Sequence, residues 1–155
     1  MTHLKTETIQ KYVIKLKKKY HTSNPFKIAE HLNIQVLFED LGSIHGYYNK
    51  QLRMKQIHIN KKLPPVIQYH TCAHELGHAI LHPHSNTIFL RNDDPLSVND
   101  LEREASTFAI LLMLGNVDRI IPANCDIGLA VRVMAYYKWM RIHNIIPAKK
   151  GIYQM

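Results

Sequence analysis

One pentapeptide, His74-Glu75-Leu76-Gly77-His78, has residue types and spacing that suit metal-assisted hydrolysis. Residues four apart lie one turn above each other on an α-helix, so His74 and His78 can direct both imidazoles at one ion. Zinc accepts imidazole nitrogens, and a catalytic zinc takes three protein ligands and a water. Glu75 lies about 100° around the helix from His74. There it can take a proton from activated water and return it to the leaving amine of a cut peptide.

The chain has 11 histidines, so this H-E-x-x-H motif could also arise by chance. Its surroundings favour a real site. Apolar residues recur at helical spacing between Pro64-Pro65 and Pro83, which predicts a helix over residues 65–82 with the motif inside it. Gly77 in mid-helix costs about 1 kcal/mol relative to alanine and indicates that another element approaches closely there.

A third metal ligand is expected downstream, on a second helix predicted for residues 97–115, with Ser97 near its start. Glu102 lies at the edge of the apolar face of this helix, whereas Glu104 points about 200° away from Glu102. Ser106, one turn after Glu102, can hydrogen-bond a ligand histidine. Spacing alone leaves Glu102 and Glu104 as nearly equal candidates, and both could instead be solvated glutamates.

The segments that must position this site are predicted to form a small α+β domain. Helical spacing predicts a helix over residues 6–20, and Asn24 before Pro25 predicts a second helix that ends near Asn33. Short strands are expected at residues 34–38, 47–48 and 56–60, and their closeness in sequence favours an antiparallel meander. A last helix is expected over residues 127–143. We predict a single domain over residues 1–155, with its N-terminal helices and sheet in residues 6–60.

The composition, with 46% hydrophobic and 21% charged residues, is ordinary for a folded protein. The formal charge of +8 could attract nucleic acid, but the basic runs lack interleaved aromatic residues, so direct nucleic-acid binding is possible and not favoured. No apolar run is long enough to cross a membrane, the first residues lack a signal-peptide core, and there are only two cysteines. These features predict a cytoplasmic protein. Cys72 is expected to be a small buried hydrophobe.

The motifs resemble those of the ImmA/IrrE metallopeptidases of bacteria, phages and integrative elements. The first matching piece continues from the pentapeptide through Ala79-Ile80-Leu81-His82. The second is Glu102-x-x-Ala105-Ser106-x-Phe108-Ala109-x-x-Leu112, similar to a family pattern whose first glutamate binds zinc. By resemblance, Glu102 rather than Glu104 is therefore the third ligand. Ser106 stands where the family has Asn or Asp, and Leu114 where it has proline.

The resemblance covers about residues 25–115 and implies a compact gluzincin-like domain, with a short antiparallel sheet packed on the H-E-x-x-H helix and helices around it. It further implies one zinc ion held by His74, His78 and Glu102, and a protein substrate. Family members often relieve repression by cutting a helix-turn-helix repressor, so the expected substrate is such a repressor of a phage or mobile element. The alternatives are a non-proteolytic metal-containing regulator that binds a repressor or DNA, and a structural zinc domain.

Two questions about other residues stay open in the sequence. His82 is too far from His74 to share an ion, and we interpret it as a histidine favoured by the helix C-terminus. A donor for the oxyanion is also needed. The candidates are Tyr47, Tyr48, Tyr69, His45 and His70.

Overall fold

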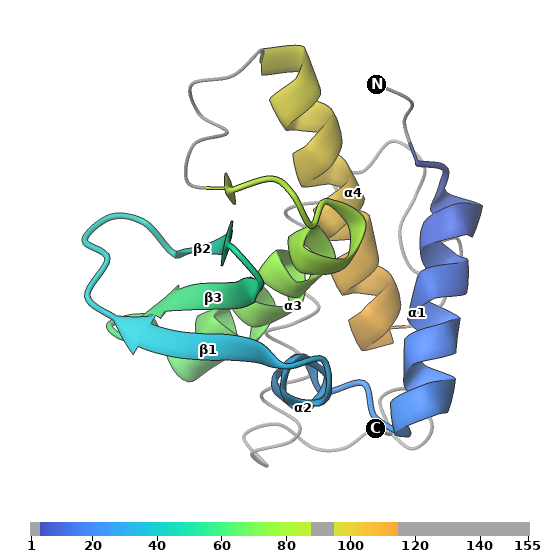
Figure 1. Cartoon of the computed structure of the whole chain (residues 1–155), viewed down its shortest axis with the longest axis horizontal. Coiled ribbons are helices and arrows are strands. Elements are labelled where there is room, and N and C mark those ends of the chain that lie inside the picture. Colours follow the sequence, from blue (N-terminus) through green and yellow to red (C-terminus); the bar gives the residue numbers. More distant parts are fainter. Residues whose placement is uncertain (1–3, 88–94, 115–155) are drawn as a thin grey trace, which may run out of the picture.

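The computed structural model describes residues 4–87 and 95–114 (Figure 1). The order of its elements is α1 (Thr6–Tyr20), α2 (Pro25–His31), β1 (Ile34–Glu39), β2 (Gly46–Gln51), β3 (Met54–Asn60), α3 (Pro65–Leu81) and α4 (Pro95–Leu114). The helix expected at residues 127–143 lies outside the described residues, as does part of the predicted 1–155 domain.

Local sequence signals account for the first two helices. The side chain of Asn24 accepts a hydrogen bond from the Phe26 N–H at 2.9 Å, and Pro25 occupies the first turn, so α2 begins as predicted. At the end of α1, His21 adopts a left-handed conformation (φ 54°), and its N–H donates to the Lys17 carbonyl at 2.8 Å. Ile9 and Val13 bury the inner face of α1.

The α+β class is confirmed, but the prediction of an antiparallel meander is wrong. The strand order is β1-β3-β2, with β3 parallel to β1 and antiparallel to β2. Only Leu52 and Arg53 separate the paired residues Gln51 and Met54, so β2 and β3 form a tight hairpin. β1 lies on the other side of β3 and does not pair with β2, the strand that follows it in the chain.

Burial explains why β3 takes the central place in the sheet. Ile57 and Ile59 are fully buried, and the polar residues between and after them, His58 and Asn60, are buried as well. Asn60 Nδ2 donates to the carbonyls of Gly42 and Ile44, each at 2.9 Å. These two bonds hold the loop that leads from β1 to β2. The alternation of polar residues with the isoleucines would by itself indicate only a half-buried strand.

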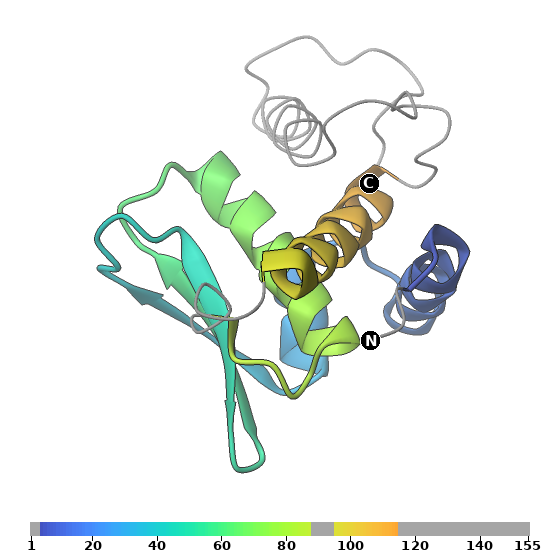
Figure 2. The same cartoon turned by 90° about the horizontal axis from the view of Figure 1, so that it is seen from above.

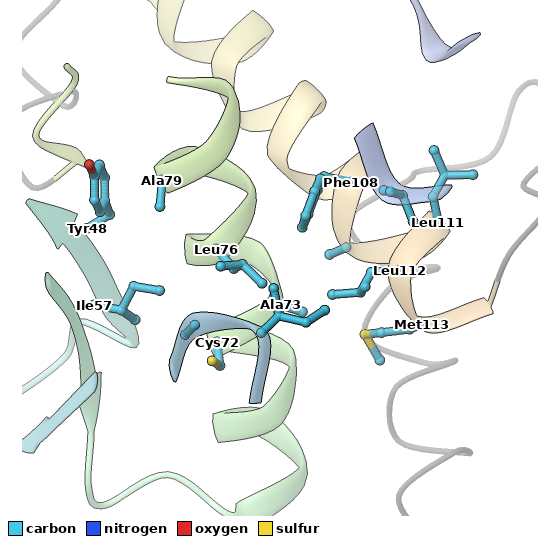
Figure 3. Close-up of a cluster of buried hydrophobic side chains, with 14 of the residues drawn as sticks. Tyr48, Ile57, Cys72, Ala73, Leu76, Ala79, Phe108, Leu111, Leu112 and Met113 are labelled. Atoms are coloured by element: carbon cyan, nitrogen blue, oxygen red, sulfur yellow. The ribbon is translucent and has the colours of Figure 1, made fainter. Parts of the chain in front are cut away.

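The layers run from the sheet through α3 and α4 to α1 (Figures 1 and 2). The core lies where α3 packs between the sheet and α4 (Figure 3). Tyr48 and Ile57 enter it from the sheet, Leu76 from the middle of α3, and Phe108 and Leu112 from α4. Among the helices of the described residues, none is both long and apolar enough to cross a membrane.

At Gly77, helices α3 and α4 approach each other closely. A Cβ atom there would lie 3.0 Å from the Ala105 carbonyl oxygen and 3.1 Å from both Ala105 Cα and Phe108 Cδ1. The predicted close approach at Gly77 is confirmed, and the approaching element is α4. The unfavourable helix propensity of glycine is thus offset by the packing of two helix backbones.

Replacing Gly77 by valine should lower the thermal midpoint by about 2–12 °C, because overpacking against α4 costs about 1–3 kcal/mol and each kcal/mol shifts the midpoint of a protein of this size by about 2–4 °C. The measurement is a calorimetric melting curve of the metal-free protein. Gln68→Val is the matched control, since it places the same side chain on α3 at a partly exposed position. An unchanged midpoint for Gly77→Val would contradict the close packing of α3 and α4.

Candidate metal centre

Three side chains that are far apart in sequence meet between α3 and α4. One ligand atom from each of His74, His78 and Glu102 lies within 4.8 Å of the other two. The Glu102 carboxylate bridges the two rings, with His74 Nε2 at 2.8 Å from Oε2 and His78 Nε2 at 3.1 Å from Oε1. Both imidazoles therefore present the same nitrogen to one carboxylate.

This donor set fits a zinc ion. Donor atoms bound to one tetrahedral zinc at 2.0–2.1 Å lie about 3.3 Å apart, so the observed separations of 2.8 and 3.1 Å need only small adjustments. The His78 side chain is fully buried, whereas the Glu102 side chain is 44% exposed, which leaves the group open on one side. Among the described residues, no fourth His, Cys, Asp or Glu joins this group. Catalytic zinc sites likewise have three protein ligands and leave one position open.

The electrostatics of the group keep Glu102 ready to bind a cation. Partial burial of Glu102 disfavours its ionised form, but hydrogen bonds from His74 and His78 outweigh this effect and hold its pKa well below the usual range. Glu102 is therefore negatively charged at neutral pH.

The second nitrogen of each ring is also engaged. Ser106 Oγ lies 3.4 Å from His74 Nδ1, which is the neighbour that the sequence suggested for a ligand histidine. His82 Nδ1 lies 3.0 Å from His78 Nδ1, inside the protein. Because the Nδ1 atoms of His74 and His78 contact Ser106 and His82, the Nε2 atoms of both rings face the carboxylate of Glu102.

His82 therefore does more than the sequence indicated. It directly follows α3, and its N–H donates to the His78 carbonyl at 2.7 Å, as expected for a residue at the helix end. It is outside the donor group, in agreement with the estimate that it is too far from His74. Its ring, however, is buried against His78, and burial lowers the pKa of His82 in spite of its hydrogen bond to Glu104.

Glu104, the alternative third ligand, lies away from the donor group. Its side chain is 9% exposed, with Oε2 at 2.9 Å from His82 Nε2 and Oε1 accepting the Leu4 N–H at 2.8 Å. The geometry thus favours Glu102 over Glu104 as a ligand. Glu104 is also not a solvated glutamate, which was the other possibility in the sequence.

Glu75 lies one residue beyond His74 on α3 and is 7% exposed. Thr87 Oγ1 donates to Glu75 Oε2 at 3.2 Å and accepts the Tyr48 N–H at 2.7 Å. Sequence reasoning missed Thr87, because a threonine in a polar loop carries no signal of its own. The structure shows that it connects the sheet to the residue expected to act as a base.

The outer edge of β2 is partly covered by this same segment. The Lys50 N–H donates to Asn86 Oδ1 at 2.9 Å, and the Tyr48 N–H is bound to Thr87. Side chains of residues 86 and 87 thus take the positions that an added strand would use along this part of β2.

A cleft of about 410 Å³ opens beside the donor group, and His74, Glu75, Glu102 and Ser106 line one side of it. The other lining residues come from the loop before β2, the first residue of β2 and the first half of α3, namely Ser43, Ile44, His45, Gly46, His70 and Thr71. A Cβ atom on Gly46 would lie 2.6 Å from both the His58 carbonyl oxygen and Thr71 Cγ2. Glycine therefore lets β2 start directly against α3.

The cleft narrows the choice of an oxyanion donor. Of the five candidates, only His45 and His70 are among the residues that line it. The Tyr48 hydroxyl donates to the Pro83 carbonyl at 2.8 Å, and Tyr47 stacks on the His58 ring. Tyr69 packs against the core, as expected, and burial raises its pKa to about 12.

Cys72 is fully buried, as predicted, and burial raises the pKa of its thiol.

Comparisons with known proteins agree with the residues of this centre. A family described as the IrrE N-terminal-like domain, a family of peptidases, matches residues 29–120. The chain is 44% identical over 107 residues to "Uncharacterized immunity region protein 2" of Bacillus phage phi105, a match that covers 68% of each chain. It is 36% identical over 99 residues to "Metallopeptidase ImmA" of Bacillus subtilis (strain 168), covering 63% of this chain and 57% of that protein. No solved structure matches significantly. The family match covers more than half of the chain and contains every residue of the donor group, so the chain belongs to the IrrE N-terminal-like family of peptidases.

Proposed function

We propose that the protein is a zinc-dependent endopeptidase in which His74, His78 and Glu102 hold one ion and Glu75 is the general base. The observation that carries the proposal is the convergence of three zinc-type donors beside a cleft that Glu75 also lines. Membership of a peptidase family supports the reaction class. The relative named as a metallopeptidase supports a metal requirement.

A zinc ion at this site would acidify a water molecule and polarise the scissile carbonyl. Glu75 accepts the proton of the attacking water and passes it to the leaving amine, which restores the carboxylate. The Thr87 hydroxyl, 3.2 Å from Glu75 Oε2, holds the carboxylate in place while Oε1 is left for the proton. His45 and His70, on the cleft wall, are the groups that can donate to the developing oxyanion.

The substrate that we propose is a helix-turn-helix repressor of a phage or mobile element. This follows the resemblance to the ImmA/IrrE peptidases, and it is supported by a relative named for the immunity region of a phage. An open cleft between the sheet and α3 suits an extended segment of a protein better than a small enclosed ligand.

The alternative is a metal-containing regulator that binds a repressor or DNA without cutting it. The formal charge of +8 is the observation that favours it. An endopeptidase needs the Glu75 carboxylate as a base, whereas a regulator that only binds its partner does not. Glu75 lies beside the donor group and is not part of it.

The metal-binding part of the proposal is tested by Glu102→Gln, which keeps the shape of the side chain and removes its charge. The wild-type chain should bind one equivalent of zinc, and the variant should bind it at least about 100-fold more weakly because a first ligand is lost. Metal content after dialysis and calorimetric titration measure this. Glu30→Gln on the exposed face of α2 is the matched control. Equal affinity of both variants would show that Glu102 is not a ligand.

The catalytic part is tested by Glu75→Gln in a strain that also expresses a helix-turn-helix repressor as the candidate substrate. Cleavage, followed by immunoblot, should fall by about 10²–10⁴-fold because no base remains to accept the proton of water. Zinc content and thermal midpoint should stay close to those of the wild type. If Glu75→Gln still relieves repression fully, the protein acts by binding, and the alternative function is the correct one.

A further inference from the structure

Behind the donor group lie two buried ionisable side chains that the proposed reaction does not use. His82 is 8% exposed and Glu104 is 7% exposed. A buried carboxylate is unfavourable unless charges or hydrogen bonds compensate for its lost hydration. An apolar residue at either position would avoid this penalty, so the pair calls for a functional reason.

The two side chains form a continuous chain of hydrogen bonds that ends on His78. His78 Nδ1 lies 3.0 Å from His82 Nδ1, and His82 Nε2 lies 2.9 Å from Glu104 Oε2. The other oxygen of Glu104 accepts the Leu4 N–H at 2.8 Å. Every polar atom along this chain is thus engaged, and the carboxylate is held at both of its oxygens.

The protons in this chain follow from its two ends. The Leu4 N–H can only donate, so Glu104 accepts at Oε1. When an ion is bound at His78 Nε2, the nitrogen that faces Glu102 at 3.1 Å, this nitrogen carries no proton, so neutral His78 then has its proton on Nδ1. His78 therefore donates to His82 Nδ1, and His82 donates from Nε2 to Glu104. This assignment gives each contact one proton.

We propose that His82 and Glu104 are positioning residues that fix the tautomer and ring orientation of His78 and raise the affinity of the site for its ion. The inference rests on the proposed metal site. It departs from the usual arrangement, in which a carboxylate contacts the ligand histidine directly, because here a second imidazole stands between them.

Two comparisons within the site support this role. At the corresponding nitrogen of His74, the neutral hydroxyl of Ser106 lies at the longer distance of 3.4 Å. The contact of His78 Nδ1 with His82, at 3.0 Å, is shorter, and it leads on to a carboxylate. The charges also match, since a divalent ion is balanced by the carboxylates of Glu102 and Glu104, one on each side of His78.

The test is a set of zinc dissociation constants for the full-length chain, measured by competition with a chromophoric chelator. His82→Leu breaks the chain of hydrogen bonds at its centre, and we expect the zinc affinity of this variant to be 10–100-fold lower than that of the wild type. His82→Asn keeps an acceptor near the Nδ1 position without reaching Glu104, so its affinity should lie between those of the leucine variant and the wild type. Thr107→Val is the matched control, because it removes a buried hydrogen bond of α4 that ends on the Arg103 carbonyl.

A double-mutant cycle shows whether Glu104 acts through His82. Glu104→Gln should weaken zinc binding about tenfold in the wild-type background and much less when residue 82 is already leucine. Side-chain nitrogen NMR of the zinc-loaded wild type should show His82 protonated at Nε2 and not at Nδ1. A role limited to packing would not produce that tautomer or that non-additivity.

The outcomes separate the two proposals. If the wild type binds no zinc, the proposed function fails, and this inference fails with it. If the wild type binds zinc and His82→Leu binds it equally well, only the positioning role is overturned. The positioning role is also overturned if two results occur together. The zinc affinity of His82→Leu would fall only in proportion to the loss in melting temperature of the metal-free protein, and the zinc affinity of Thr107→Val would fall by as much.

Discussion

The contact between the backbones of α3 and α4 at Gly77 and Ala105 is the constraint on which the site depends. Gly77 lies between His74 and His78 on one helix, and Ala105 lies between Glu102 and Ser106 on the other. Close approach at this point brings the flanking polar side chains within hydrogen-bonding distance. A larger residue at either position would move the carboxylate away from the imidazoles. Helices also hold donors more rigidly than loops do.

The same contact creates an electrostatic problem that the surrounding residues resolve. Three imidazoles and three carboxylates are concentrated around one helix crossing, with His78 fully buried. Such groups are stable there only when each is hydrogen-bonded, and the described contacts meet this condition for Glu102, Glu104 and Glu75. Polar groups thus order the interior beside the metal site, while the apolar cluster that includes Leu76 supplies hydrophobic stabilisation.

The parts of the fold and site that the sequence revealed are those encoded by local spacing. The His74–His78 separation of four residues, the cap at Asn24 and the glycine at 77 each have a local physical meaning, and the structure contains the helices that were expected within the described residues. The choice between Glu102 and Glu104 was different, because it depends on how α4 is rotated against α3. The sequence left that choice open on spacing alone, and only the resemblance to a family decided it.

What local patterns could not reveal depends on contacts between distant segments. The mixed sheet results from β3 entering between β1 and β2, a choice made by the burial of His58 and Asn60 against partners in other segments. Thr87 gains its role because it bridges β2 and α3. His82 was noticed for its spacing, yet spacing to His74 was the wrong comparison. Its separation of four residues from His78 was the informative one, because residues four apart on a helix are neighbours whether or not both bind the metal.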